Sequence, residues 1–174
     1  MKAKLIALSA VSAALTAIIL SAGAIFELID LVTVCFAPMF FSMPLYFNSK
    51  KGAFLASFVG GIIALMVNPF SLVGVFHFGF MGIYPILKYI FITKNKKQFL
   101  FKTLSLIWFI VVCIGAYFFY FKVLGGVPNE VFGLPEWSWP LIITGLAVVF
   151  FFLLDKCIYV VQYSVFRILN KIIK

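Results

Sequence analysis

The chain has 174 residues, of which 65% are apolar, 19% aromatic and only 11% charged, and its formal net charge is +9. A water-soluble globule of this composition would lack the polar surface needed to cover itself. The composition therefore predicts an integral protein of the cell membrane, with one multi-pass membrane domain over residues 1–174. The lysines form short clusters between apolar segments, which is typical of charges that orient a chain in a bilayer and argues against nucleic-acid binding.

Charged residues, Asn, Pro and Gly divide the chain into six apolar segments that read as membrane helices. The third segment is short, so it either crosses with little tilt or forms a tight helical hairpin with the fourth through Asn68-Pro69. The predicted fold class is all-α, a polytopic bundle of six transmembrane helices. The predicted spans are residues 4–26, 29–47, 52–67, 71–93, 103–124 and 140–163.

The first span carries small residues at alternating steps of four and three, which places them along one side of a helix. Span 52–67 has a similar strip of small residues, with Gly and Ala at steps of four. Small side chains let another helix approach closely, so the strips indicate either tight packing inside the molecule or docking of another membrane subunit. The candidate partner-binding residues are Ala3, Ala7, Ala10, Ala14 and Ala17.

The start of the first span also has some features of a cleaved signal peptide. Lys2 and Lys4 precede an apolar run that ends in small residues at 21–24. The run is longer than a typical signal core and further spans follow at once, which favours a retained membrane helix.

The fourth span contains the only histidine of the chain together with a proline and a lysine. Pro85 removes one helix hydrogen bond and predicts a kink near Tyr84. Lys88 lies near the predicted cytoplasmic end, where its long side chain can reach the headgroups, so its charge need not be buried. His77 either binds a ligand or is a structural group with satisfied hydrogen bonds.

The longest predicted outer segment, residues 125–140, contains Glu136, Trp137 and Trp139. The tryptophans suit interfacial anchors, and the same segment could also fold over a cavity as a lid. The last span continues into a stretch with Gln162 and Arg167, which predicts either a helix along the inner membrane surface or an ordinary basic helix end.

Charge alternates between the breaks that separate the spans. Lysines lie at the start, after the second and fourth spans and at the end, whereas four of the five acidic residues follow the first and fifth spans. Because positive residues favour the cytoplasmic side, this pattern predicts that both termini are cytoplasmic.

Several kinds of catalytic site are absent from the sequence. A single histidine excludes a His-rich zinc site, and neither a phosphate-binding loop nor a Ser–His–Asp set is present. We therefore expect no enzyme activity, no metal and no cofactor. The three cysteines lie far apart in apolar surroundings and are most simply packing residues.

This layout resembles the substrate-binding S-component of energy-coupling factor transporters. The resemblance is carried by six short helices, both ends inside, a variable outer loop and A-x-x-x-A spacing at Ala3/Ala7, Ala10/Ala14 and Ala13/Ala17. It implies that the first helix contacts a transmembrane coupling subunit, that cytoplasmic ATPases supply energy, and that a vitamin or related micronutrient binds near the outer side. The string from Gly82 to Lys88, G-x-Y-P-x-x-K, also resembles a motif of small membrane proteins of Gram-positive bacteria.

The first functional hypothesis is a substrate-capturing membrane subunit of a micronutrient uptake transporter. The outer half of the predicted bundle has few polar side chains, so an apolar or aromatic small molecule fits better than a polar vitamin. The alternative is a scaffold protein of the bacterial envelope, of the rod-shape type, that has no ligand. The candidate substrate-binding residues are Asn68, His77, Tyr84, Glu136 and Trp137.

Overall fold

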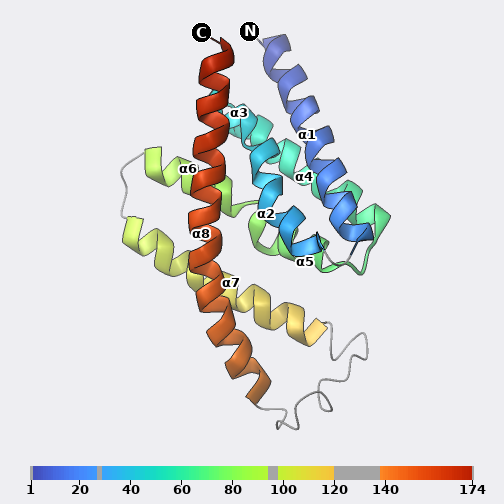
Figure 1. Cartoon of the computed structure of the whole chain (residues 1–174), viewed down its shortest axis with the longest axis vertical. Helices are drawn as coiled ribbons and strands as arrows, with labels where there is room; N and C mark the ends of the chain where they lie inside the picture. Colours follow the sequence, from blue (N-terminus) through green and yellow to red (C-terminus); the bar gives the residue numbers. More distant parts are fainter. Residues whose placement is uncertain (1, 27–28, 94–97, 120–137, 174) are drawn as a thin grey trace.

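The computed structural model describes residues 2–26, 29–93, 98–119 and 138–173, and within them every regular element is helical, which confirms the all-α class. The chain termini lie at the same end of the molecule, where α1 begins and α8 ends (Figure 1). In chain order the elements are α1 (Lys2–Ile25), α2 (Asp30–Phe41), α3 (Met43–Tyr46), α4 (Lys50–Val67), α5 (Leu72–Phe76), the π-helical segment η2 (His77–Met81), α6 (Tyr84–Thr93), α7 (Gln98–Phe118) and α8 (Ser138–Ile173).

Five helical segments of the described residues are long and apolar enough to cross a membrane: Ala3–Ile25, Lys50–Val67, Leu72–Ile92, Gln98–Phe118 and Ser138–Lys171. The predicted second span is instead a shorter apolar segment, Asp30–Tyr46, divided at Ser42 into α2 and α3. This segment is shorter than the other five and lies near the lower limit of the range of about 17–25 residues for a membrane helix. The number of six crossings therefore stays a prediction.

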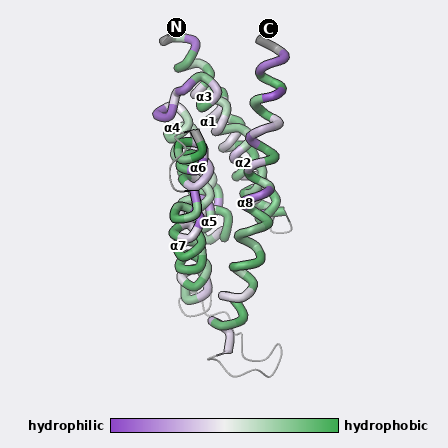
Figure 2. Tube along the Cα trace, turned by 90° about the vertical axis from the view of Figure 1, so that its left-hand side faces the viewer, coloured by the Kyte–Doolittle hydropathy of each residue, from purple (hydrophilic) through white to green (hydrophobic). Residues whose placement is uncertain are grey.

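Large apolar side chains cover the outside of the long helices. Ile18 of α1, Met66 of α4 and Val111 of α7 are 67%, 78% and 63% exposed. Soluble monomers rarely expose apolar surface so continuously. Hydrophilic residues concentrate toward the end that holds the termini, and much of the remaining length is hydrophobic (Figure 2). The structure is thus that of a membrane-type helical bundle.

The small-residue strip of α4 packs directly against α1. A Cβ atom added at Gly60 would lie 2.7 Å from Thr16 Cγ2 and 3.1 Å from the backbone nitrogen of Ala17. A Cβ atom at Gly52 would lie 2.3 Å from Ser9 Oγ. The glycines of span 52–67 are therefore required for close helix packing inside the molecule, one of the two alternatives that the sequence left open.

The fourth predicted span is helical but interrupted. The π-helical segment η2 ends at Met81, the backbone turns at Gly82 and Ile83, and α6 then begins at Tyr84. Pro85 lies in the first turn of α6, where the absence of an N–H group has little cost. The discontinuity predicted at Pro85 thus falls just before it.

The last helix, α8, runs along the whole length of the molecule (Figure 1). Its 36 residues correspond to about 54 Å at the rise of an α-helix, compared with about 30 Å for the hydrocarbon core of a bilayer. Near its end, Asn170 accepts a hydrogen bond of 2.7 Å from the Tyr46 hydroxyl of α3. The stretch after Tyr159 therefore continues α8 as a single helix up to Ile173.

Candidate functional site

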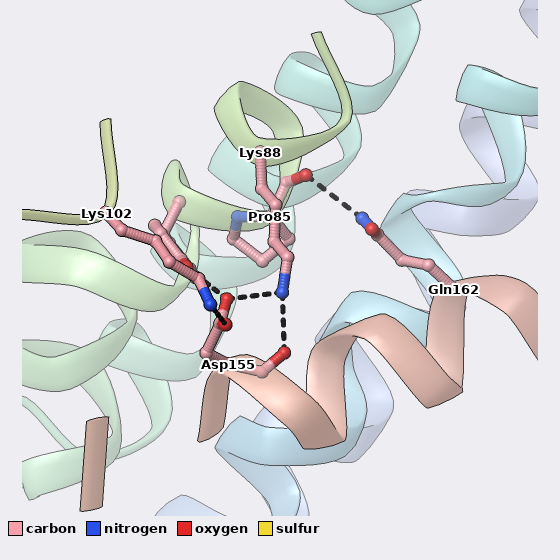
Figure 3. A network of polar contacts seen from close by, with 6 residues as sticks. Pro85, Lys88, Lys102, Asp155 and Gln162 are labelled. Atoms are coloured by element: carbon pink, nitrogen blue, oxygen red, sulfur yellow. Dashed lines mark hydrogen bonds and ion pairs between the residues drawn. The ribbon is translucent and has the colours of Figure 1, made fainter. Parts of the chain in front are cut away.

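Asp155 of α8 lies at the centre of a charged cluster to which three helices contribute (Figure 3). Its carboxylate forms an ion pair with Lys88 of α6, accepts a 2.5 Å hydrogen bond from Tyr84 and lies 3.0 Å from the ammonium of Lys102 of α7. The Lys88 ammonium also donates to the backbone carbonyl of Asp155 at 2.6 Å. Lys88 and Asp155 are 6% and 5% exposed, whereas the Lys102 side chain is 52% exposed. The buried ion pair of Lys88 and Asp155 is thus joined by a second cation, the half-exposed Lys102.

Helix periodicity places these groups on facing surfaces. Tyr84 and Lys88, the two hydrogen-bond donors of α6, are four residues apart, so they project from the same face of the helix. On α8, Gln162 follows Asp155 by about two turns. The Gln162 amide donates to the carbonyl of Pro85 at 3.0 Å and to the hydroxyl of Ser42 at 3.2 Å. The polar side chains of α8 therefore connect it to α6 and to the turn between α2 and α3.

The charge of Lys88, which the sequence does not require to be buried, is buried in the structure. The side chain does not extend to the surface, because Asp155 supplies a carboxylate within the bundle. Taking two charges out of water costs several kcal/mol for each ion, and their attraction offsets this only with good geometry and further hydrogen bonds. Such a pair inside a membrane-type bundle is a candidate functional group.

A cavity of about 510 Å³ lies beside the charged cluster, between α6, α7 and α8. We refer to it as the charged cavity. Aromatic rings form another part of its wall, and Phe91 and Phe101 stack with their centroids 4.5 Å apart. Its polar wall consists of Lys88, Gln98, Lys102, Asp155 and Lys156.

A second cavity, of about 460 Å³, lies between α2, α5, α7 and the first half of α8. We refer to it as the apolar cavity. It lies toward the N-terminal end of α8, away from the two chain termini (Figure 1). Its walls include Val34, Leu72, Phe76, Phe109, Ala116, Ala147 and Phe150. A volume of this size with apolar and aromatic walls is typical of a site for a small molecule.

Two of the three free cysteines, Cys35 and Cys113, also line the apolar cavity, whereas Cys157 does not. Within the described residues, no three His, Cys, Asp or Glu side chains come close enough together to hold a metal ion. The cysteines therefore act there as small apolar wall residues.

The structure does not bring the described substrate-binding candidates together. The Asn68 amide donates to the carbonyl of Ala24 at 3.0 Å and so joins the ends of α4 and α1. Tyr84 belongs to the charged cluster and lines the charged cavity. None of Asn68, His77 and Tyr84 lines the apolar cavity. Glu136 and Trp137 lie outside the described residues.

His77 is 1% exposed and is held within the bundle by α4. Its Nε2 atom lies 3.0 Å from the carbonyl oxygen of Ser57 and 3.2 Å from the Ser57 hydroxyl. That hydroxyl donates to the carbonyl of Gly82 at 2.9 Å. These contacts connect α4 to the interrupted segment before α6. They satisfy Nε2 alone, because Nδ1 is buried without a hydrogen-bond partner among the described residues, so both interpretations of His77 stay open.

The alanine strip of α1 is mostly turned away from the bundle. Ala3, Ala7, Ala10 and Ala14 are exposed, and only Ala17 is buried at 6%. The side of α1 that contacts α4 carries Ser9 and Thr16 instead. The strips of α1 and α4 therefore differ, since the first is largely free and the second is buried.

Sequence reasoning missed Asp155, the centre of the charged cluster. A signal was available, because Asp155 and Lys156 interrupt an apolar run of the last predicted span. The partner of Asp155 could not be identified in this way, because Lys88 lies 67 positions away along the chain.

No family model, curated protein or solved structure matches this chain. The two cavities, the charged cluster and the exposed face of α1 are the features of the chain that bear on its function.

Proposed function

We propose that the protein is the substrate-capturing membrane subunit of a micronutrient uptake transporter and that it binds an apolar or aromatic small molecule. The apolar cavity carries this proposal. Its volume of about 460 Å³ suits one small solute, and its walls offer apolar and aromatic contacts rather than charges. The protein would work with a transmembrane coupling subunit and cytoplasmic ATPases.

The position of the cavity is consistent with capture from outside the cell. The lysine clusters favour a cytoplasmic location for both termini, and the two termini lie together at one end of the molecule (Figure 1). The apolar cavity lies toward the opposite end. Six crossings of the cell membrane, with Asp30–Tyr46 as a short second one, would satisfy this orientation.

The exposed alanine strip of α1 supports contact with a coupling subunit. A neighbouring helix can approach closely at Ala10 and Ala14, because both are exposed and have small side chains.

The coupling contact is tested by co-expression with a coupling subunit and its ATPases from the same genome. Ala10→Leu combined with Ala14→Leu should abolish copurification while the protein still inserts, because the added side chains keep the partner helix away. Ile107→Phe combined with Val111→Phe adds bulk at exposed positions of α7, away from the α1 strip, and should retain copurification. Retained association of the leucine variant, or copurification of a cell-wall protein in place of the coupling subunit, would contradict the proposal.

The orientation is tested by cysteine labelling of intact cells. We expect Glu136→Cys to react with a membrane-impermeant maleimide from outside, and Lys96→Cys to react only after the cells are opened. The three native cysteines are first replaced by alanine or serine to remove background. Labelling of both positions from the same compartment would refute the proposed topology.

A further inference from the structure

The charges that line the charged cavity do not balance. Among the described residues that line it, Lys88, Lys102 and Lys156 contribute three ammonium groups, whereas Asp155 is the only carboxylate. Lys88 and Asp155 neutralise each other as a buried pair. The ammonium groups of the exposed Lys102 and Lys156 therefore remain in excess at the wall of the cavity.

The two excess cations can both reach a ligand. The Lys102 side chain is 52% exposed and uses one ammonium contact on Asp155, so further donors are available. Lys156 is exposed, lines the cavity and has no ion-pair partner in the described part of the chain. Gln98 adds an amide at the start of α7. Together these groups make a recognition surface for an anion.

We propose that the charged cavity binds the phosphate group of an anionic ligand, with Lys102 and Lys156 as the direct contacts. Lys88 and Asp155 would hold α6 and α8 in place behind that contact. This assignment concerns a different cavity from the one that carries the proposed function and does not depend on a captured solute.

The surroundings of the cavity favour a phospholipid headgroup as the source of the phosphate. Ile92, Tyr159 and Val160 line it and are 40%, 56% and 59% exposed, so its wall extends onto the apolar outer surface of the bundle. A volume of about 510 Å³ exceeds the needs of a phosphate alone and leaves room for a glycerol unit. Basic pockets between membrane helices are a known type of site for anionic headgroups.

The experiment is a lipid titration of the purified full-length protein by native mass spectrometry. Phosphatidylglycerol and phosphatidylcholine with identical acyl chains are the probes. The test variant combines Lys102→Gln with Lys156→Gln, both exposed in the wild type. The matched control combines Lys50→Gln with Lys51→Gln, which removes the same charge at exposed positions of α4.

Wild-type protein should prefer phosphatidylglycerol, and the test variant should lose that preference by about 30-fold, about fivefold for each ammonium removed. The control should keep the wild-type preference. Equal binding of the two lipids by the wild type, or an unchanged preference in the test variant, would overturn the proposal.

Competition identifies the source of the phosphate. If glycerol 3-phosphate or inorganic phosphate displaces phosphatidylglycerol from the wild type, the site accepts a soluble phosphate, which supports anion binding without a requirement for acyl chains. If neither displaces it, the headgroup and its chains bind together, which supports the lipid assignment.

Discussion

The two cavities lie along the same pair of helices and differ in the charge of their walls. The apolar cavity is lined by the second half of α7 and the first half of α8, from Phe109 to Tyr117 and from Ile143 to Leu154. The charged cavity is lined by the start of α7 and the next stretch of α8, from Asp155 to Val160. The change from one to the other occurs between Leu154 and Asp155, two adjacent residues of one helix.

This difference shows how a single long helix can contribute to two separate sites. The apolar cavity depends on shape, because its walls attract a ligand by excluding water and by contact. The charged cavity depends on ion-pair partners, because each charge that is buried in a low-dielectric interior must be compensated by an opposite charge. Substitutions can therefore alter one cavity and leave the other intact, which the following predictions exploit.

The largest effect is expected from Asp155→Asn. The change leaves the Lys88 ammonium buried without a counter-charge, which typically costs about 3–5 kcal/mol of stability. For a chain of this size we expect the unfolding midpoint in detergent to fall by about 6–20 °C, measured by thermal unfolding. The same change at Asp30, which lies at the start of α2 outside the buried cluster, serves as the control and should have little effect.

A double replacement separates charge imbalance from loss of packing. Lys88→Met combined with Asp155→Leu removes both ions, so most of the stability should return. If Asp155→Asn unfolds at the wild-type temperature, the buried pair does not govern stability in this part of the bundle.

The second effect is loss of the captured small molecule in Ala147→Phe. Ala147 is 4% exposed and lines the apolar cavity, so a phenyl ring would occupy the space of a ligand. We expect occupancy by a copurifying small molecule to fall at least about tenfold, measured by native mass spectrometry. Phosphatidylglycerol binding at the charged cavity should stay unchanged.

Val149→Phe is the matched control, because Val149 lies on the same helix and is 58% exposed. It should retain the small molecule. Equal occupancy of wild type and Ala147→Phe would show that the molecule binds elsewhere.

Much of the helical layout was accessible from the sequence, because it depends on local patterns. The predicted spans 52–67 and 71–93 correspond closely to Lys50–Val67 and to the helical run from Leu72 to Thr93. The predicted last span, 140–163, lies within α8, and the basic stretch that follows it in the sequence continues the same helix to Ile173. Contacts with α2, α3 and α6 keep this polar part of α8 within the bundle.

The two cavities could not be predicted in the same way, because they depend on tertiary contacts. The sequence shows only that the Lys88 side chain can reach the headgroups, since its partner Asp155 lies on a distant segment. Asn68 and His77 were chosen as ligand contacts because polar side chains are rare in this sequence. In the structure, both bond to the backbone of neighbouring helices, at Ala24 and at Ser57.

A smaller effect is expected from Gln162→Met, which nearly conserves side-chain length and volume. The variant loses the hydrogen bonds to Pro85 and Ser42, so it should lose about 1–2 kcal/mol of stability. Thermal unfolding should show a decrease of about 2–8 °C. Gln98→Met changes an exposed glutamine in the same way and should leave the midpoint unchanged. Equal midpoints for the two variants would mean that the connection from α8 to α6 contributes nothing.

The smallest effect on stability is expected from Lys102→Gln, although Lys102 contacts the same carboxylate as Lys88. Its side chain is 52% exposed, so water screens the ion pair and its contribution is at most about 1 kcal/mol, a midpoint shift below about 4 °C. Lys88→Gln should lower the midpoint far more, because it leaves Asp155 buried with only a half-exposed cation nearby. If thermal unfolding gave the two glutamine variants the same midpoint, burial would not separate the two lysines. The division between a structural cation at Lys88 and a ligand-binding cation at Lys102 would then fail.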